Sequence, residues 1–169
     1  MSRPRKSTKD KNHNDLLWVM KNRLGGYKRS IFVNEKGQSI KGSHAANLQG
    51  LRVLAYDTAD AGNEMLDWVV HVSWFVMYLE VKVEREVKSK SHQRLSDEAY
   101  YRSLLKKSER VFMQNCLSVS RIVYNTNMIY ELLNQAADFV FYVDDGMINN
   151  LSNLKVFFPK LQQRTQIND

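Results

Sequence analysis

The chain has 169 residues, a formal net charge of +7 at pH 7 and a hydrophobic content of 43%. This length fits one domain, and the apolar content is sufficient for a hydrophobic core. Cys116 is the only cysteine in the sequence, which excludes a disulfide framework and a cysteine-rich zinc site and suits a reducing, cytoplasmic location. The positive charge predicts an anionic partner, most often a nucleic acid.

The sequence gives no sign of a membrane partner. Its longest apolar stretch, residues 68–79, is interrupted by His71 and Ser73 and is too short to cross a bilayer. The N-terminus has no apolar signal region.

Residues 1–13 form a basic, apolar-poor segment that we expect to be a flexible arm. Serine, threonine and asparagine accompany its cations, which are Arg3, Arg5, Lys6, Lys9 and Lys11. The arm either contacts nucleic-acid phosphates or only solubilises the terminus. We favour phosphate contact because the whole chain is basic.

The first half of the chain predicts a helix followed by strands. A helix is expected over 14–24, stopped by Gly25 and Gly26. Segments 27–33 and 38–41 predict a hairpin around the turn at 34–37. A short helix or loop is expected at 43–49, and a strand at 51–57 because apolar residues alternate there.

Two further strands are predicted on either side of Ser73 and Trp74. In the second strand the apolar side chains share one face, whereas Glu80 and Lys82 lie on the other. If the chain reverses at Ser73-Trp74, Asp67 lies directly opposite Glu80. Ser-Trp is an unfavourable two-residue turn, however, because such turns prefer Gly, Asn or Asp.

Opposed side chains in a sheet have Cβ atoms roughly 4.5–5.5 Å apart. Two carboxylates that close repel unless a cation or a proton lies between them. Mg²⁺ is a suitable cation because it takes one or two carboxylates together with waters and phosphate. The alternative, given equal weight, is an edge hairpin whose charged ends are solvated.

The second half of the chain predicts more helix. Helices are expected at 96–109 and 127–135, with a strand at 121–124 between them. Residues 139–143 resemble a further strand, Asp144 and Asp145 resemble the start of a helix, and a helix and polar tail are expected over 145–169.

These segments carry short motifs that resemble one nuclease superfamily. The motifs are Leu51-Arg52-Val53, Asp57-Thr58, Gly62, Leu66-Asp67-Trp68-Val69-Val70, Tyr78-Leu79-Glu80-Val81-Lys82, Leu95-Ser96-Asp97-Glu98 and Arg121-Ile122-Val123. In order and spacing they resemble the PD-(D/E)xK nucleases, most of all the small VRR-type and Holliday-junction-resolvase-like enzymes of phages and bacteria. The similarity covers roughly residues 12–136.

The resemblance implies an α/β fold with a restriction-endonuclease-like core, in which helices flank a mixed central β-sheet. A single nuclease-like domain would cover 14–169, with an insertion around 27–49. Asp67 and Glu80 match the metal-binding acids of the family and Lys82 its catalytic lysine, and the backbone carbonyl of Val81 would complete a site for Mg²⁺ or Mn²⁺. The chain departs from the family where Leu66 replaces a proline and where only Asp15 is a candidate for the acid of the first helix.

The implied activity is metal-dependent hydrolysis of DNA phosphodiester bonds by an endonuclease, with junction-resolving and homing types both open. A homodimer is expected by analogy with nucleases that cut both strands, and the cytoplasm would be that of the host if the chain is phage-encoded. The alternatives are a non-catalytic nucleic-acid-binding protein on a nuclease fold and a structural or phage-assembly protein.

We predict that the basic arm raises affinity for nucleic acid without setting sequence preference. Deleting residues 2–11 should reduce the log–log salt dependence of binding by about 0.9 for each phosphate that the arm neutralises in the full chain. Titrations of the full and shortened chains at several salt concentrations measure this slope. An unchanged slope would show that the arm does not touch nucleic acid.

Overall fold

The computed structural model describes residues 11–58, 65–85 and 96–145. Six strands form one sheet in the order of the sequence. The strands are β1 (Gly25–Arg29), β2 (Ser43–Leu48), β3 (Leu51–Asp57), β4 (Trp68–Val72), β5 (Phe75–Val81) and β6 (Val119–Val123). Neighbours from β1 to β5 are antiparallel, whereas β5 and β6 are parallel, so the sheet is mixed.

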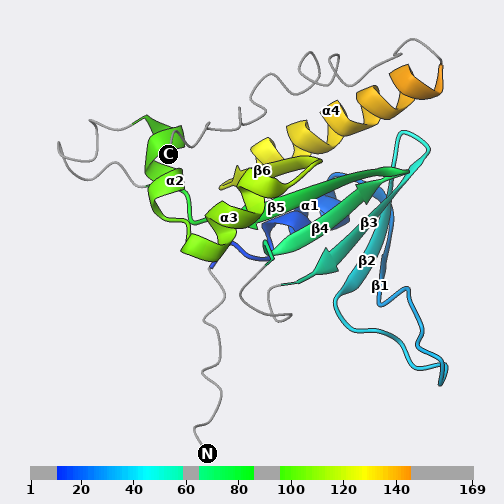
Figure 1. Ribbon diagram of the computed structural model, residues 1–169. Coiled ribbons are helices and arrows are strands. Elements are labelled where there is room, and N and C mark those ends of the chain that lie inside the picture. Colours follow the sequence, from blue (N-terminus) through cyan, green and yellow to red (C-terminus); the bar gives the residue numbers. More distant parts are fainter. Residues whose placement is uncertain (1–10, 59–64, 86–95, 146–169) are drawn as a thin grey trace, which may run out of the picture.

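Helices lie on both faces of this sheet (Figure 1). They are α1 (Asp15–Asn22), α2 (Asp97–Ser103), α3 (Lys107–Asn115) and α4 (Thr126–Asp144). Helices α1 and α4 bury their apolar sides against one face in the main core. A smaller cluster joins α3 to the other face, where β5 and β6 lie. The predicted α/β fold with a mixed, helix-flanked sheet is therefore confirmed.

The main core follows from the alternation of side chains along the strands. Apolar side chains of β3, β4 and β5 that point toward α1 and α4 are almost fully buried, and they are Val53, Ala55, Trp68, Val70, Val72, Phe75, Met77, Leu79 and Val81. The side chains between them point to the other face and are mostly only half-buried. A strand that buries one face produces this period of two.

The predicted reversal at Ser73 and Trp74 is confirmed. Val72 pairs with Phe75, and the ladder runs on to the pair of Trp68 and Leu79. Ser73 has φ 55°, a left-handed conformation that is uncommon for a residue with a side chain. Its N–H donates to the Arg52 carbonyl at 2.8 Å, which ties the turn to β3.

Two predictions for the region 27–49 need correction. The segment 43–49, expected as helix or loop, contains strand β2 at 43–48, which pairs with β3 along its whole length. The predicted reversal around 34–37 is observed, because Val33 bridges Ser39 and the Ile40 N–H donates to the Phe32 carbonyl at 2.7 Å. The regular strands that it joins, however, are β1 and β2, which lie farther from the turn than the predicted strands 27–33 and 38–41. Both strands belong to the central sheet, so this region extends the sheet at its β1 edge.

The helical predictions for 96–145 also need correction. The single helix expected at 96–109 is two helices that are separated by a break at 104–106. Leu105, within this break, packs in the smaller cluster. The strand expected at 139–143 was wrong, because α4 continues to Asp144 with Phe139 and Val140 in the core. Asp144 and Asp145 therefore end a helix, and the rest of the predicted tail, 146–169, lies outside the described residues.

No helix in the described ranges is both long enough and apolar enough to cross a membrane.

We predict that Ser73→Gly stabilises the protein. Glycine adopts positive φ without the side-chain penalty, and this gain exceeds the added chain entropy of the unfolded state by about 0.5–1 kcal/mol. Urea unfolding measures the change, with Ser73→Ala as a control that should show no such gain. A lower midpoint for the glycine variant would contradict the left-handed turn.

Candidate functional site

The structure brings the three predicted catalytic residues to one end of the sheet. Asp67 directly precedes β4, Glu80 lies in β5 and Lys82 directly follows β5. The ladder that pairs Trp68 with Leu79 leads on to Asp67 opposite Glu80. The Val81 N–H donates to Asp67 Oδ2 at 2.9 Å, which fixes the Asp67 carboxylate against β5.

Lys82 is held between two carboxylates. It is 8% exposed, and its Nζ pairs with Glu80 Oε1 and lies 3.6 Å from Glu109 Oε2. Its backbone N–H donates to the Val123 carbonyl at 2.9 Å, which extends the pairing of β5 with β6. The Lys82 ammonium is thus a buried cation with anionic neighbours from β5 and α3.

The environment disfavours the charged form of both predicted acids. Burial raises the pKa of Glu80 to about 7, the negative charge of Asp67 adds to the rise, and Lys82 opposes it. Burial also raises the pKa of Asp67. The Val81 N–H, His13 and Lys82 all act to lower this pKa, but burial outweighs them. For both acids the effect of burial on the pKa therefore exceeds the opposing effect of Lys82.

Glu109, on α3, is a third acid at this site that the sequence analysis missed. Its Oε2 accepts the Lys106 N–H at 2.7 Å, and Lys106 Nζ lies 3.3 Å from Oε1. Burial acts to raise the pKa of Glu109, but the Lys106 N–H and the lysine charges outweigh it and lower the pKa. Its position four residues from both Leu105 and Met113, which are buried, is the sequence signal that points it inward.

His13 is a second residue that the sequence analysis missed. It is 2% exposed, although it falls within the segment expected to be a flexible arm. Its Nε2 lies 3.1 Å from Asp57 Oδ2, and its Nδ1 lies 3.9 Å from Asp67 Oδ1. The ring stacks on Trp68 at 5.1 Å between centroids, and the His13 carbonyl accepts the Trp68 Nε1–H at 3.0 Å. His13 therefore links the start of α1 to the acid end of β3 and β4.

The other predicted site residues are Asp15, Val81 and the cations of the arm. Asp15 has its pKa raised by burial and then by the charge of Glu84, so its acidic neighbour is Glu84. Lys11 is exposed, and the other four arm cations lie outside the described residues. The Val81 N–H donates a hydrogen bond to Asp67. The role of the Val81 carbonyl as a metal ligand stays a prediction.

The donor set at this site matches only one kind of metal binding. Within the described ranges, no group of three or more His, Cys, Asp and Glu side chains is placed to hold a metal. Asp67 and Glu80 nevertheless bring two carboxylates, each with a raised pKa, to one end of the sheet. Mg²⁺ binds through one or two carboxylates with waters and substrate phosphate. The site thus fits an ion held by two acids and not a complete cage of protein ligands.

Comparisons of the chain with protein-family models, with curated proteins and with solved structures find no match. The likeness to restriction-endonuclease-like folds accordingly stays a prediction.

We predict that Glu80→Gln changes how stability depends on pH. The folded chain keeps the Glu80 proton up to about pH 7, whereas the unfolded chain releases it near the ordinary value of 4.5. The folded state binds more protons in that window, so the wild-type free energy of unfolding should fall as pH rises through it. A glutamine, which cannot ionise, should remove that fall and be more stable at pH 8 by an amount on the order of 1 kcal/mol.

Chemical unfolding at pH 4.5, 6, 7 and 8 measures this effect. Glu131→Gln, on an exposed part of α4, is the matched control and should leave the wild-type profile unchanged. Parallel profiles for wild type and Glu80→Gln would show that Glu80 ionises without hindrance.

Proposed function

We propose that this chain is a metal-dependent nuclease that hydrolyses phosphodiester bonds of DNA. Asp67 and Glu80 would hold Mg²⁺ or Mn²⁺, and Lys82 would act on the phosphate. The observation that supports this most is the opposition of a half-buried Asp67 to a buried Glu80, each with a raised pKa, next to the buried Lys82. Perturbed groups clustered in this way are typical of functional sites.

Each residue of the site has a distinct role in this proposal. A bound divalent ion would lower the pKa of a coordinated water and screen charge on the phosphate. Asp67 is oriented for ligation because the Val81 N–H holds one of its oxygens, Oδ2. Glu80 offers the second carboxylate from the neighbouring strand.

Lys82 is suited to an electrostatic role. Two nearby carboxylates favour the charged ammonium over the neutral amine that a general base requires. When Glu80 serves as a metal ligand, Glu109 at 3.6 Å still keeps the ammonium in the site. Lys82 is then able to neutralise the scissile phosphate and stabilise the charge that develops on it.

One observation favours a second function. The ion pair between Lys82 and Glu80 partly neutralises the acids without any metal, as expected if the chain binds nucleic acid but does not cut it. A non-catalytic nucleic-acid-binding protein on a nuclease-like sheet is therefore the alternative.

Cleavage assays separate the two functions. Supercoiled plasmid, linear duplex, single-stranded and branched DNA are each incubated with Mg²⁺, Mn²⁺ or EDTA. We expect cleavage that requires metal and that falls on the order of 100-fold or more in Asp67→Ala, Glu80→Gln and Lys82→Ala. Binding of DNA should survive in all three variants, because the basic surface supplies it.

The variants have two controls. Glu131→Gln should cleave like wild type, and metal titration should show that Lys82→Ala keeps the ion, because lysine is not a ligand. Cleavage that persists in Glu80→Gln would refute the assignment of the site, and binding without cleavage on any substrate would favour the non-catalytic alternative.

A further inference from the structure

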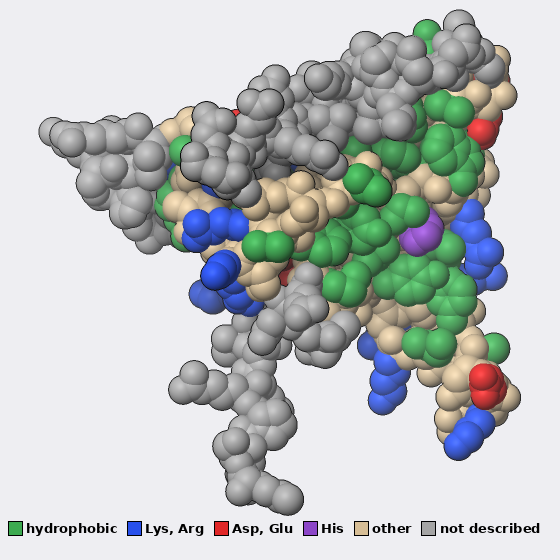
Figure 2. Space-filling model, viewed as in Figure 1, with side chains coloured by type: hydrophobic (Ala, Val, Ile, Leu, Met, Phe, Trp, Pro, Cys, Tyr) green, Lys and Arg blue, Asp and Glu red, His purple; other side chains and the backbone are tan. Residues whose placement is uncertain are grey.

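The sheet face opposite α1 and α4 is covered by α3 only near β5 and β6 (Figure 1). Over β3, β4 and β5 this face carries half-buried, mainly apolar side chains: Leu54, Tyr56, Val69, His71, Val76 and Tyr78. We call these six residues the open face. In Figure 2 hydrophobic side chains gather around a histidine on the surface of the molecule, with Lys and Arg side chains at the margins.

Aromatic rings are arranged across the open face. Phe32, from the β1–β2 connection, stacks on Tyr56 with centroids 5.2 Å apart and planes 17° from parallel. Tyr56 meets the edge of His71 at 5.7 Å. Tyr78 meets Phe112 of α3 edge-on at 5.0 Å. Because Tyr56 pairs with Val69 and Val69 with Tyr78, the two tyrosines lie in one row across the sheet. His71 lies in the next row, beside Tyr56.

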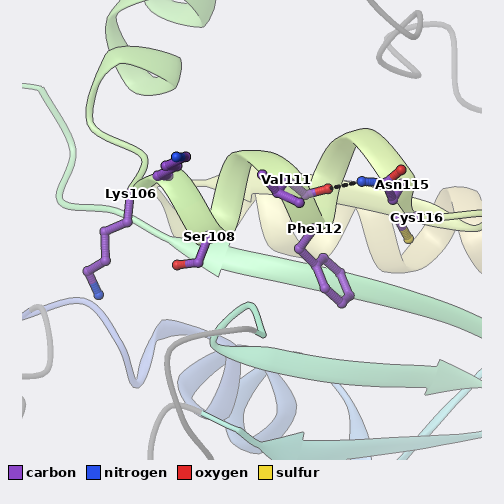
Figure 3. Close-up of a pocket in the computed structure, with 7 residues that line it drawn as sticks. Lys106, Ser108, Val111, Phe112, Asn115 and Cys116 are labelled. Carbon is purple, nitrogen blue, oxygen red and sulfur yellow. Dashed lines mark hydrogen bonds between the residues drawn. The ribbon is translucent and has the colours of Figure 1, made fainter.

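The row ends at a hollow beside α3. Phe112 lines this hollow of about 860 Å³ together with Val111 and Cys116, and Lys106 and Lys107 lie at the end where α3 begins. In Figure 3 the Phe112 ring extends from α3 toward the sheet, and Lys106 lies at the opposite end of the group from Cys116. The hollow is thus apolar along its length and basic at one end.

Cations also lie at the far side of the open face. Arg52 precedes Leu54 by two residues on β3 and therefore shares its face, and Lys28 is the partner of Ala45, which pairs with Leu54. Both cations are exposed. The aromatic row consequently runs between Lys28 and Arg52 at one side and Lys106 and Lys107 at the other.

We propose that the open face binds single-stranded nucleic acid, with bases stacked on Tyr56, His71 and Tyr78 and phosphates contacted by the flanking lysines and Arg52. Single-strand binding surfaces combine aromatic rings with a basic path in this way, since unpaired bases expose their faces whereas a duplex hides them. A second copy of this chain fits the face less well, because two molecules of charge +7 repel each other.

The open face lies next to the acid site, so the proposed nuclease would take a single strand as its substrate. Tyr78 and Glu80 lie on the same side of β5, two residues and therefore about 7 Å apart. A strand stacked on Tyr78 passes directly beside Asp67 and Glu80. This last step rests on the proposed function, whereas the binding itself does not and is measured without metal.

Binding is tested with the full chain in EDTA, using fluorescein-labelled oligothymidine and a duplex of equal length. Tyr56→Ala should weaken single-strand binding about 10-fold, as expected for the loss of one stacked base, and should change duplex binding much less. Trp18→Ala is the matched control, because Trp18 is an aromatic side chain 48% exposed on α1. Tyr56→Phe, which keeps the ring, should bind like wild type.

A second measurement needs no variant and holds even if Tyr56→Ala fails to fold. Oligothymidine with one 5-iodouracil is irradiated on the wild-type chain, and cross-linked peptides are identified by mass spectrometry. We expect cross-links in the peptides that contain Tyr56, His71 or Tyr78. Cross-links only in other segments, or equal losses for Tyr56→Ala and Trp18→Ala, would overturn the proposal.

Light scattering tests whether the open face instead binds a second copy of this chain. A wild-type dimer that Tyr56→Ala converts to a monomer would assign the open face to a second copy and overturn the proposal. Single-strand binding that behaves as expected, in a chain that cleaves nothing, would support the open face while refuting the nuclease.

Discussion

The pairing register of β4 and β5 is the constraint on which the site depends. A shift by one residue would turn every side chain of a strand to the opposite face, and Asp67 would no longer lie opposite Glu80. The Ser-Trp turn is a weak determinant of this register, because Ser73 adopts a positive φ that glycine accepts more readily. The core is the stronger one, since a slip would bring Trp68 and Met77, both fully buried, to the other face. The apolar side chains on one face of each strand therefore fix the positions of the charged side chains on the other face.

Burial gives the acids at this site their chemical character. Charged groups are costly to remove from water unless they are paired, and Glu80, Lys82 and Glu109 are all less than a tenth exposed. Lys82 compensates Glu80, and the Lys106 amide compensates Glu109, but the pKa of Glu80 remains raised to about 7. This raised pKa at a site where two acids are opposed is part of what motivates the proposed function.

The sequence predicted the fold best in strands where apolar and polar side chains alternate regularly. Strand β3 was predicted at its observed bounds, and β4 and β5 were predicted on the two sides of the Ser73-Trp74 turn, because side chains alternate there. Strand β2 was missed because small residues such as Ala45 and Ala46 are buried on both of its faces, which removes the alternation. The end of α4 resembled a strand because its residues 139–143 are aromatic and β-branched, types that favour strands. The alternation within the β4–β5 hairpin was sufficient to place Asp67, Glu80 and Lys82 on one face of the sheet. His13 and Glu109, in contrast, reach the site through packing between segments that are distant in the sequence.

Helix α3 connects the acid site to the open face. Glu109 and Phe112 are three residues apart and so lie on the same side of the helix: Glu109 faces Lys82, and Phe112 meets Tyr78. The helix is held there by Leu105 and Met113, which pack in the small cluster with Leu66. Leu66 directly precedes Asp67, so the same apolar packing that seats α3 also fixes the backbone from which Asp67 extends. A movement of α3 would thus alter the charge around Lys82 and the aromatic row together, and the site and the open face behave as one surface.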